Sequence, residues 1–265
     1  MAVANPSEEM IADPNKENKI FTISEWKEYF NVNLEYGNHS EPWKRETIIH
    51  FSIKYQSLRH DSNDSEESVL RKCLKYELEI DKEIEPIPNE SFLCGKLKNS
   101  DASHAEVILF DRLCKGFISF QEEKKKKDQK KTTTNSKSDD LSEGMSKLHV
   151  TDGDQATDLN NLSIELIQNY STCSDCAAVI IAFIDKFSSM WNIRISIIFG
   201  SFYKFDTSYY GNNNLEGLKK LHNKGIKLNT AWDRFRKIFA VIGTPEQRAR
   251  REMADLNNMA IVKGN

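Results

Sequence analysis

The segment Leu162-Ser-Ile-Glu-Leu-Ile-Gln-Asn-Tyr-Ser-Thr-Cys-Ser-Asp-Cys-Ala-Ala-Val-Ile-Ile-Ala-Phe-Ile-Asp-Lys-Phe187 contains a change of hydrophobic period that decides the fold class. Leu162, Ile164 and Leu166 alternate with polar residues, which is typical of a β-strand with one buried face. From Cys173 the apolar residues recur every three or four positions, which predicts an amphipathic helix over 173–187. Its apolar stripe consists of Val179, Ile180, Phe183, Ile184 and Phe187. A strand followed by a helix is the repeating unit of α/β domains.

Outward from this segment, the same patterns predict four more strands and several helices. Alternating apolar residues place strands at 49–55, 92–97, 193–199 and 226–228. Further helices are predicted at 23–30, from Ser103 or His104 to Gly116, at 215–224, at 233–242 and from Pro245 onward. A helix between the last two strands implies that these strands are parallel. The sum is an α/β sandwich in which helices flank one five-stranded mixed sheet.

Local signals define the ends and faces of these helices. The candidate N-caps are Ser171 or Thr172 for 173–187, Asn214 for 215–224 and Thr244 for the last helix. Gly225 stands at the C′ position of 215–224, while Thr244 is followed by Pro245 at the N1 position and by Gln247 as its capping-box partner. The residues expected to face the sheet from the helix that starts near His104 are Val107, Ile108 and Leu113.

We expect a single domain over 19–265, preceded by a polar, disordered N-terminus over 1–18. Two insertions are expected within it. The stretch 57–90 is predicted to be an acidic linker with one amphipathic piece at 69–78. The low-complexity stretch 121–160 is predicted to be disordered, because it cannot bury a core. Its lysine cluster fits either a nuclear-localisation signal or a solubilising loop.

Composition excludes several classes of protein. Of the 265 residues, 38% are hydrophobic and 29% are charged, which supports a packed core with polar segments outside it. The five cysteines are odd in number and mostly scattered, unlike a secreted disulfide framework. The N-terminus has no signal-peptide pattern, and no run reaches about 18 apolar residues. We therefore expect a soluble protein in the cytoplasm and/or nucleus, with no membrane partner.

The net charge of −3 conceals an uneven distribution. Residues 61–90 carry ten acids and four bases, whereas residues 219–252 carry ten bases and three acids. The basic region either attracts phosphates of a nucleic acid or is a solvated helical surface.

Four residues, His104, Glu106, Cys173 and Cys176, point to a specific chemistry. One imidazole and two thiolates hold a zinc ion and leave one tetrahedral position for water. Glu106 is not needed as a ligand and is therefore available to move protons. Both ligand groups are expected at helix starts, where the helix dipole favours the thiolate. The two cysteines are three residues apart and therefore share one helical face.

The Cys-x-x-Cys spacing has other interpretations. It also occurs in redox pairs and as half of a structural zinc site. A four-cysteine structural site needs a second pair, whereas Cys73, Cys94 and Cys114 are scattered. A thioredoxin-like pair is expected after the first strand of a small domain, not two thirds along the chain. We therefore favour a hydrolytic zinc site.

These residues resemble the His-x-Glu and Cys-x-x-Cys signature of the AID/APOBEC family of zinc-dependent polynucleotide cytidine deaminases. Further similarity is distributed over much of the chain. The similar stretches are Lys44-Arg-Glu-Thr47, Gly95-Lys-Leu-Lys-Asn99, Ile198-Phe-Gly-Ser-Phe-Tyr203, Glu216-Gly-Leu-Lys-Lys-Leu221 with Gly225-Ile226, and Asp233-Arg-Phe235 with Phe239.

The sequence also departs from the family pattern. Thr172 stands where the signature has Pro, Tyr170 where the family usually has Trp, and Ser201 where it often has Arg. The separation of 69 residues between His104 and Cys173 is longer than usual, and the stretch 121–160 accounts for it. Thr172 removes no ligand and Tyr170 keeps an aromatic face, whereas Ser201 changes the usual packing of the base pocket.

The resemblance implies a three-layer cytidine-deaminase-like sandwich that converts cytosine to uracil in single-stranded DNA or RNA. It implies Zn²⁺ held by His104, Cys173 and Cys176, with Glu106 as the catalytic acid and base. The residues that it places at the substrate are Asn99, Thr47, Arg45, Tyr170, Ser171, Tyr203 and Phe205. The alternatives are a free cytidine or nucleotide deaminase and an inactive zinc-containing protein that binds nucleic acid.

Overall fold

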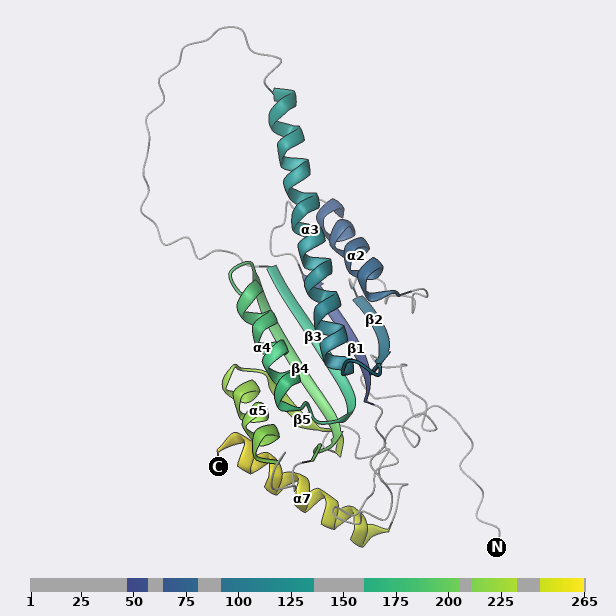
Figure 1. Cartoon of the computed structure of the whole chain (residues 1–265), viewed down its shortest axis with the longest axis vertical. Coiled ribbons are helices and arrows are strands. Elements are labelled where there is room, and N and C mark those ends of the chain that lie inside the picture. Colours follow the sequence, from purple (N-terminus) through teal and green to yellow (C-terminus); the bar gives the residue numbers. More distant parts are fainter. Residues whose placement is uncertain are drawn as a thin grey trace, which may run out of the picture.

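Residues 47–56, 64–80, 92–135, 160–204, 211–232 and 244–264 are described by a computed structural model. The elements in chain order are β1 (Ile48–Gln56), α2 (Asp64–Leu78), β2 (Phe92–Lys98), α3 (Ala105–Asn135), β3 (Asn160–Tyr170), α4 (Ser174–Phe187), β4 (Trp191–Ser201), α5 (Gly211–Asn223), β5 (Lys227–Thr230) and α7 (Pro245–Lys263) (Figure 1). The predicted helices at 23–30 and 233–242, and the N-terminal stretch 1–18, lie outside the described residues.

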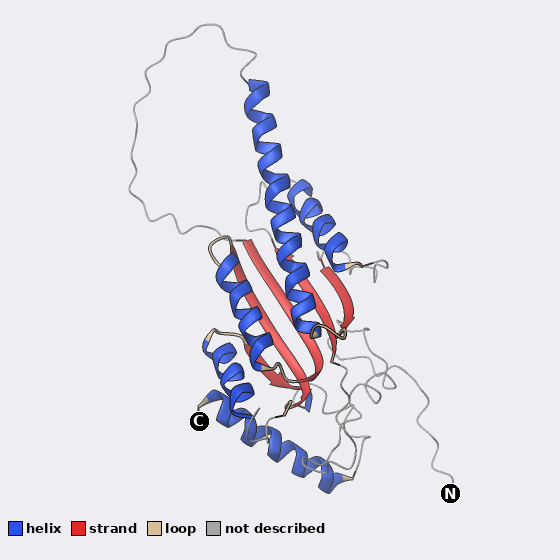
Figure 2. Cartoon of the chain, viewed as in Figure 1, coloured by secondary structure: helices blue, strands red, loops and turns tan. Residues whose placement is uncertain are grey.

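The five strands form one mixed sheet in the order β2-β1-β3-β4-β5 (Figure 2). β1 is antiparallel to β2 and to β3, whereas β3, β4 and β5 are mutually parallel. Each strand overlaps the stretch predicted for it, and the predicted parallel pairing of β4 with β5 is confirmed. The α/β class with a five-stranded mixed sheet is therefore confirmed.

Helices α2 to α5 cover one face of this sheet (Figures 1 and 2). Crossovers between parallel strands are right-handed, so α4, between β3 and β4, and α5, between β4 and β5, reach the same face. Neighbouring helices contact one another along the row from α2 to α5. Alternate strand residues, such as Ile49, Phe51 and Ile53 of β1, are buried in the core beneath them.

Aromatic rings fill the middle of this core. Phe117 of α3 contacts Phe183 and Phe187 of α4 and Trp191 of β4, with ring centroids 5.3 to 5.9 Å apart. Tilted and edge-on pairs of this kind contribute about 0.5–1.5 kcal/mol each beyond the apolar area that they bury. They hold α3 beside α4, and the first turns of both helices therefore lie close together.

The stretch 57–90 is not a continuous linker, because residues 64–78 form α2. Leu70, Leu74 and Leu78 recur every four residues and are buried in the core. Gly116 permits a close approach of α3, since a Cβ there would lie 2.8 Å from Cδ2 of Leu74. The predicted amphipathic piece at 69–78 is therefore confirmed, whereas the prediction of a linker is wrong for residues 64–68, which belong to the same helix.

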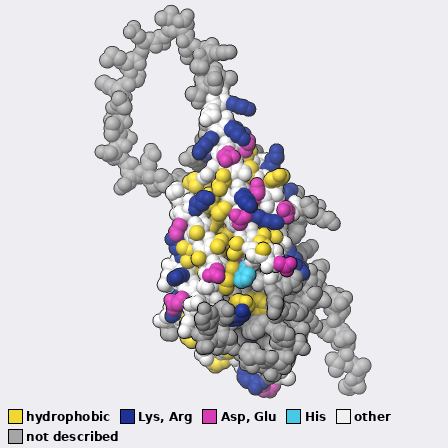
Figure 3. All heavy atoms as spheres, viewed as in Figure 1, with side chains coloured by type: hydrophobic (Ala, Val, Ile, Leu, Met, Phe, Trp, Pro, Cys, Tyr) yellow, Lys and Arg dark blue, Asp and Glu magenta, His cyan; other side chains and the backbone are white. Residues whose placement is uncertain are grey.

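Helix α3 continues well beyond Gly116, and the expectation of disorder is wrong for residues 121–135. Lys, Glu and Gln are good helix formers, and Lys124 pairs with Glu66 at 3.2 Å. The far end of α3 projects beyond the sheet (Figure 1), and Figure 3 shows basic side chains around that end. Although α3 has 31 residues, no described helix is apolar over a length that would cross a membrane. Residues 136–159 lie outside the described part.

The face of α3 that meets the sheet differs from the predicted one. Leu113 is buried as expected, but its buried neighbours are Leu109 and Phe110. Val107 and Ile108 are only half-buried. The helix is therefore rotated relative to the prediction, because its longer course adds aromatic residues that decide which side packs.

The predicted helix ends at Gly225 and Thr244 are confirmed, whereas the predicted N-caps of α4 and α5 are wrong. Gly225 has φ +86° and its N–H completes the C-terminal turn of α5. Thr244 and Gln247 form the predicted capping box of α7. Asn214 is not an N-cap, because α5 begins three residues earlier, at Gly211.

Candidate metal centre

The site lies where β2 and β3 lead into α3 and α4 (Figure 1). Both strands are antiparallel to β1, so they run in the same direction and their carboxyl ends lie at the same edge of the sheet. His104 directly precedes α3, and its carbonyl oxygen accepts the N–H of Ile108 at 3.1 Å. Cys173 directly precedes α4. This topology brings two helix starts together.

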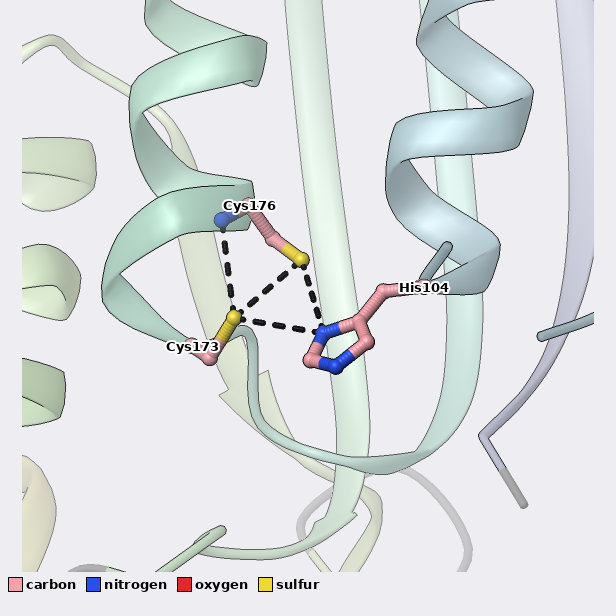
Figure 4. A group of neighbouring side chains, drawn as sticks. All are labelled: His104, Cys173 and Cys176. Carbon is pink, nitrogen blue, oxygen red and sulfur yellow. Dashed lines mark hydrogen bonds between the residues drawn. The ribbon is translucent and has the colours of Figure 1, made fainter. Parts of the chain in front are cut away.

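His104, Cys173 and Cys176 turn toward one another (Figure 4). His104 Nδ1 lies 3.4 Å from Cys173 Sγ and 3.3 Å from Cys176 Sγ, and the two sulfur atoms are 3.2 Å apart. The imidazole is exposed, whereas both thiols are buried. These three residues could hold a metal ion that remains accessible from the side of the imidazole.

The two thiols have opposite ionisation tendencies. Cys173, rather than Ser171 or Thr172, is the N-cap of α4, and its sulfur accepts the N–H of Cys176. The hydrogen bond shared with Cys176 is the largest cause that lowers the pKa of Cys173, to about 6. The same hydrogen bond, followed by burial, raises the pKa of Cys176 above its usual range. Without a metal the pair holds one proton, and a metal would replace it.

The carboxyl group of Glu106 lies beside this cluster, in the first turn of α3. It is 2% exposed, and burial raises its pKa to about 7. Its Oε2 atom has no hydrogen-bond partner among the described residues. A buried carboxyl group with one unpartnered oxygen can take up or release a proton near neutral pH.

Sequence reasoning missed Gln168, which contacts Glu106. It lies on β3, and its Nε2 is 3.4 Å from Glu106 Oε1. The same nitrogen donates to Tyr170 O at 2.7 Å and to Thr172 Oγ1 at 3.1 Å. A signal was present, because Gln168 continues the series of inward positions formed by Ile164 and Leu166.

Two of the predicted substrate residues, Asn99 and Thr47, lie together where β2 ends and β1 begins. Asn99 Oδ1 accepts the N–H of Thr47 at 3.0 Å, and Asn99 N–H donates to Thr47 O at 3.1 Å. Thr47 and Asn99 therefore extend the pairing of β1 with β2 by one residue beyond Ile48 and Lys98. Arg45, which was predicted beside Thr47, lies outside the described residues.

Tyr170, Ser171 and Tyr203 also meet at this edge of the sheet. The rings of Tyr170 and Tyr203 are half-buried, with centroids 5.8 Å apart at an angle of 50°. Ser171 is buried, its N–H donates to Ser201 O at 2.7 Å, and its Oγ accepts the N–H of Tyr203 at 2.8 Å. Ser171 therefore positions Tyr203. Phe205 lies outside the described residues.

Helix α5 supports the start of α4. Asn214 Oδ1 accepts the N–H of Ser174 at 3.2 Å, and Asn214 Nδ2 donates to Tyr203 O at 3.0 Å. Gly217 lies against the same turn, since a Cβ there would come within 2.8 Å of Ser174 Cα. Asn214 therefore bridges the metal-ligand turn and the aromatic pair, a role that its predicted capping function did not anticipate.

Ser201 of β4 contacts the guanidinium group of Arg251, which lies on a different element, α7. Arg251 of α7 donates to Ser201 Oγ at 3.2 Å and to Gly200 O. Its Nε pairs with Asp255 at 3.1 Å, and both side chains are under 5% exposed. The pair fixes α7 to the carboxyl end of β4. No local pattern in the sequence indicated this contact.

No protein-family model matches this chain, and comparison with curated proteins also finds no match. Evidence about function therefore comes from the chemistry of the site.

Proposed function

We propose that this protein is a zinc-dependent hydrolytic deaminase, on a cytidine-deaminase-like three-layer fold, that converts cytosine to uracil in single-stranded DNA or RNA. The observation that carries the proposal is the pairing of a three-residue ligand set with a buried carboxyl group outside that set. His104, Cys173 and Cys176 supply the ligand atoms, and Glu106 supplies the carboxyl group. This combination favours catalysis over a closed structural metal site.

The donor set fits zinc. A tetrahedral zinc ion, with bonds of about 2.3 Å to sulfur and about 2.05 Å to nitrogen, needs about 3.8 Å between sulfurs and about 3.6 Å between sulfur and nitrogen. The observed separations are 3.2 Å for the sulfurs and 3.3 and 3.4 Å for the sulfur–nitrogen pairs. The side chains would therefore have to separate only slightly to accept the ion.

Hydrolytic deamination replaces the exocyclic amine of cytosine with an oxygen from water, and ammonia leaves. Zinc held by His104, Cys173 and Cys176 would supply Lewis-acid activation of that water. Glu106 would receive a proton from the water, deliver one to ring nitrogen N3, and assist protonation of the leaving amine. Its burial supports this role, because burial raises its pKa to about 7, near neutral pH.

Tyr170 and Tyr203 favour a nucleobase substrate. Their paired rings lie at the edge of the sheet that carries the ligand turn, since Tyr170 is three residues before Cys173. The ammonium group of Lys204 lies 5.1 Å from the centroid of Tyr203, and so places positive charge beside the rings. Aromatic faces with a nearby cation are typical of sites for unpaired nucleotides. A base stacked inside a duplex would be inaccessible to this chemistry.

The main competing interpretation is a redox-active Cys-x-x-Cys pair, which the lowered pKa of Cys173 would also suit. Burial disfavours it. Cys173 is 8% exposed and Cys176 is 1% exposed, so a protein disulfide has little access to either sulfur. In addition, His104 lies against both thiols, which a redox pair does not need but a metal site does.

The decisive experiment incubates the zinc-loaded 265-residue chain with single-stranded DNA and RNA oligonucleotides that each contain one cytosine. We expect uracil by mass spectrometry in at least one of the two. Glu106→Gln, which preserves the ligand set, should retain zinc and form no uracil within either oligonucleotide. Duplex DNA and free cytidine are the comparison substrates. Conversion of free cytidine alone, to uridine, or full activity in Glu106→Gln, would contradict the proposal.

A further inference from the structure

Gln168 is a buried polar residue of the site to which the chemistry above gives no role. It lies on β3 at a position where the neighbouring inward residues, Ile164 and Leu166, are apolar and fully buried. Gln168 itself is only 1% exposed. Packing alone favours an apolar side chain here.

The contacts of Gln168 fix the orientation of its amide. Nε2 lies 2.7 Å from Tyr170 O, 3.1 Å from Thr172 Oγ1 and 3.4 Å from Glu106 Oε1. If oxygen and nitrogen were exchanged, two oxygen atoms without a proton between them would face each other at 2.7 Å. Nε2 therefore contacts the turn before Cys173 and the carboxyl group of Glu106 at the same time.

The remaining amide oxygen makes a purely structural role a poor explanation. Gln168 Oε1 has no hydrogen-bond partner among the described residues. A buried acceptor without a donor is destabilising, so Gln168 carries a penalty that its hydrogen bonds to Tyr170 O and Thr172 Oγ1 have to offset. Departures of this kind from packing rules are expected at functional sites.

We propose that Gln168 is a positioning residue that couples the Glu106 carboxyl group to the turn carrying Cys173. The side chain touches both the group that moves protons and the turn that delivers a metal ligand. It therefore sets the position of one relative to the other. The inference rests on the proposed function only insofar as Glu106 acts in turnover. The contact itself can be tested without activity.

The test replaces Gln168 by Met, which preserves length and removes the amide. The readout is the ¹³C resonance of the Glu106 carboxyl carbon in protein labelled at that position, assigned by its loss in Glu106→Gln. We expect the resonance to move in Gln168→Met, with and without zinc. With an active protein, kcat should fall about 10–100-fold, the range seen when residues that orient a metal site are removed. KM should change less than about twofold, because the interaction does not involve substrate.

Two controls separate positioning from folding. Gln121→Met changes a glutamine of α3 whose Nε2 contacts Met190 Sδ, far along the helix from Glu106, and should leave the resonance and kcat unchanged. Gln168→Met should retain the zinc content and the unfolding temperature of the parent protein. If it does not fold, Gln168→Glu keeps the shape of the side chain and should also move the resonance.

An unmoved Glu106 resonance in the Gln168 variant would overturn the proposal. So would a loss of kcat that is matched by an equal loss of zinc or stability, since a structural role produces that result. If the parent protein deaminates none of the tested substrates, the proposed function fails. The resonance of Glu106 still decides the coupling in that case.

Discussion

His104 Nδ1 lies 3.4 Å from Cys173 Sγ, although 69 residues separate the two in sequence. Their meeting depends on the core, because aromatic packing between Phe117 of α3 and Phe183 and Phe187 of α4 holds the two helices side by side. Each residue lies immediately before its helix, where the helix dipole favours anionic groups. The geometry of the candidate metal centre therefore depends on the packing between these two helices.

Replacing Cys173 by Ala should remove the bound metal, because two remaining protein ligands are too few for a stable site. We expect about one equivalent of zinc in the parent protein and less than about a tenth of that in the variant, measured by elemental mass spectrometry. Cys114→Ala is the matched control, since this half-buried cysteine of α3 lies outside the cluster. Normal zinc content in Cys173→Ala would refute the ligand assignment.

The stability of the zinc-free protein should depend on pH through the cysteine pair. The pKa of Cys173 is lowered from 9.0 to about 6, and that of Cys176 is raised. Between these values the folded pair loses a proton that the unfolded chain keeps, so stability should rise from about pH 6 to about pH 9. Above pH 9 the unfolded chain loses both protons while the folded pair keeps one, so stability should fall.

Unfolding temperatures of zinc-free protein across this range measure the effect. Cys173→Ser should flatten the rise below pH 9, because it removes the thiol with the lowered pKa. A rise of the same size in Cys173→Ser would show that other groups cause it.

Glu106→Gln should stabilise the zinc-free protein at alkaline pH. Burial raises the pKa of Glu106 from 4.5 to about 7, so its contribution to stability is lost as pH rises through that range. The variant should gain up to about 3 kcal/mol at pH 8 and nothing near pH 4, as judged by urea unfolding. Glu216→Gln, at an exposed position, is the control. A variant less stable than the parent at pH 8 would argue against an uncompensated buried charge.

Asp255→Asn should strongly destabilise the protein, because it leaves the buried guanidinium of Arg251 without its anion. The loss should be about 3–5 kcal/mol, whereas replacing both partners by apolar residues should cost less. The exposed pair of Lys219 and Glu216 provides the control, where removal of one partner should cost at most about 1 kcal/mol. Equal effects at the two pairs in denaturant unfolding would contradict the importance of burial.

The strands and several helix ends were predictable because their signals are local. Alternation reports which side of a strand is buried, and Gly225 and the Thr244 capping box are short motifs with one favoured conformation. The predictions failed for residues 64–68 at the start of α2 and for residues 121–135, where charged composition suggested a linker and disorder. Composition gives only the average polarity of a segment, whereas Leu70, Leu74 and Leu78, spaced four residues apart, are enough to pack a helix against the core.

The sequence by itself supplied the chemical groups of the site, which are an imidazole, two thiols at helical spacing and a nearby carboxyl group. The fold then shifts the pKa values of Glu106, through burial, and of Cys173, through its hydrogen bond with Cys176. Only the tertiary structure decided three contacts. Gln168 contacts Glu106, Arg251 contacts Ser201, and Asn99 accepts a hydrogen bond from Thr47. These partners lie 50 to 62 positions apart. Periodicity reports which side of an element is buried, but the partner of a buried polar group depends on the paths of all the elements packed around it.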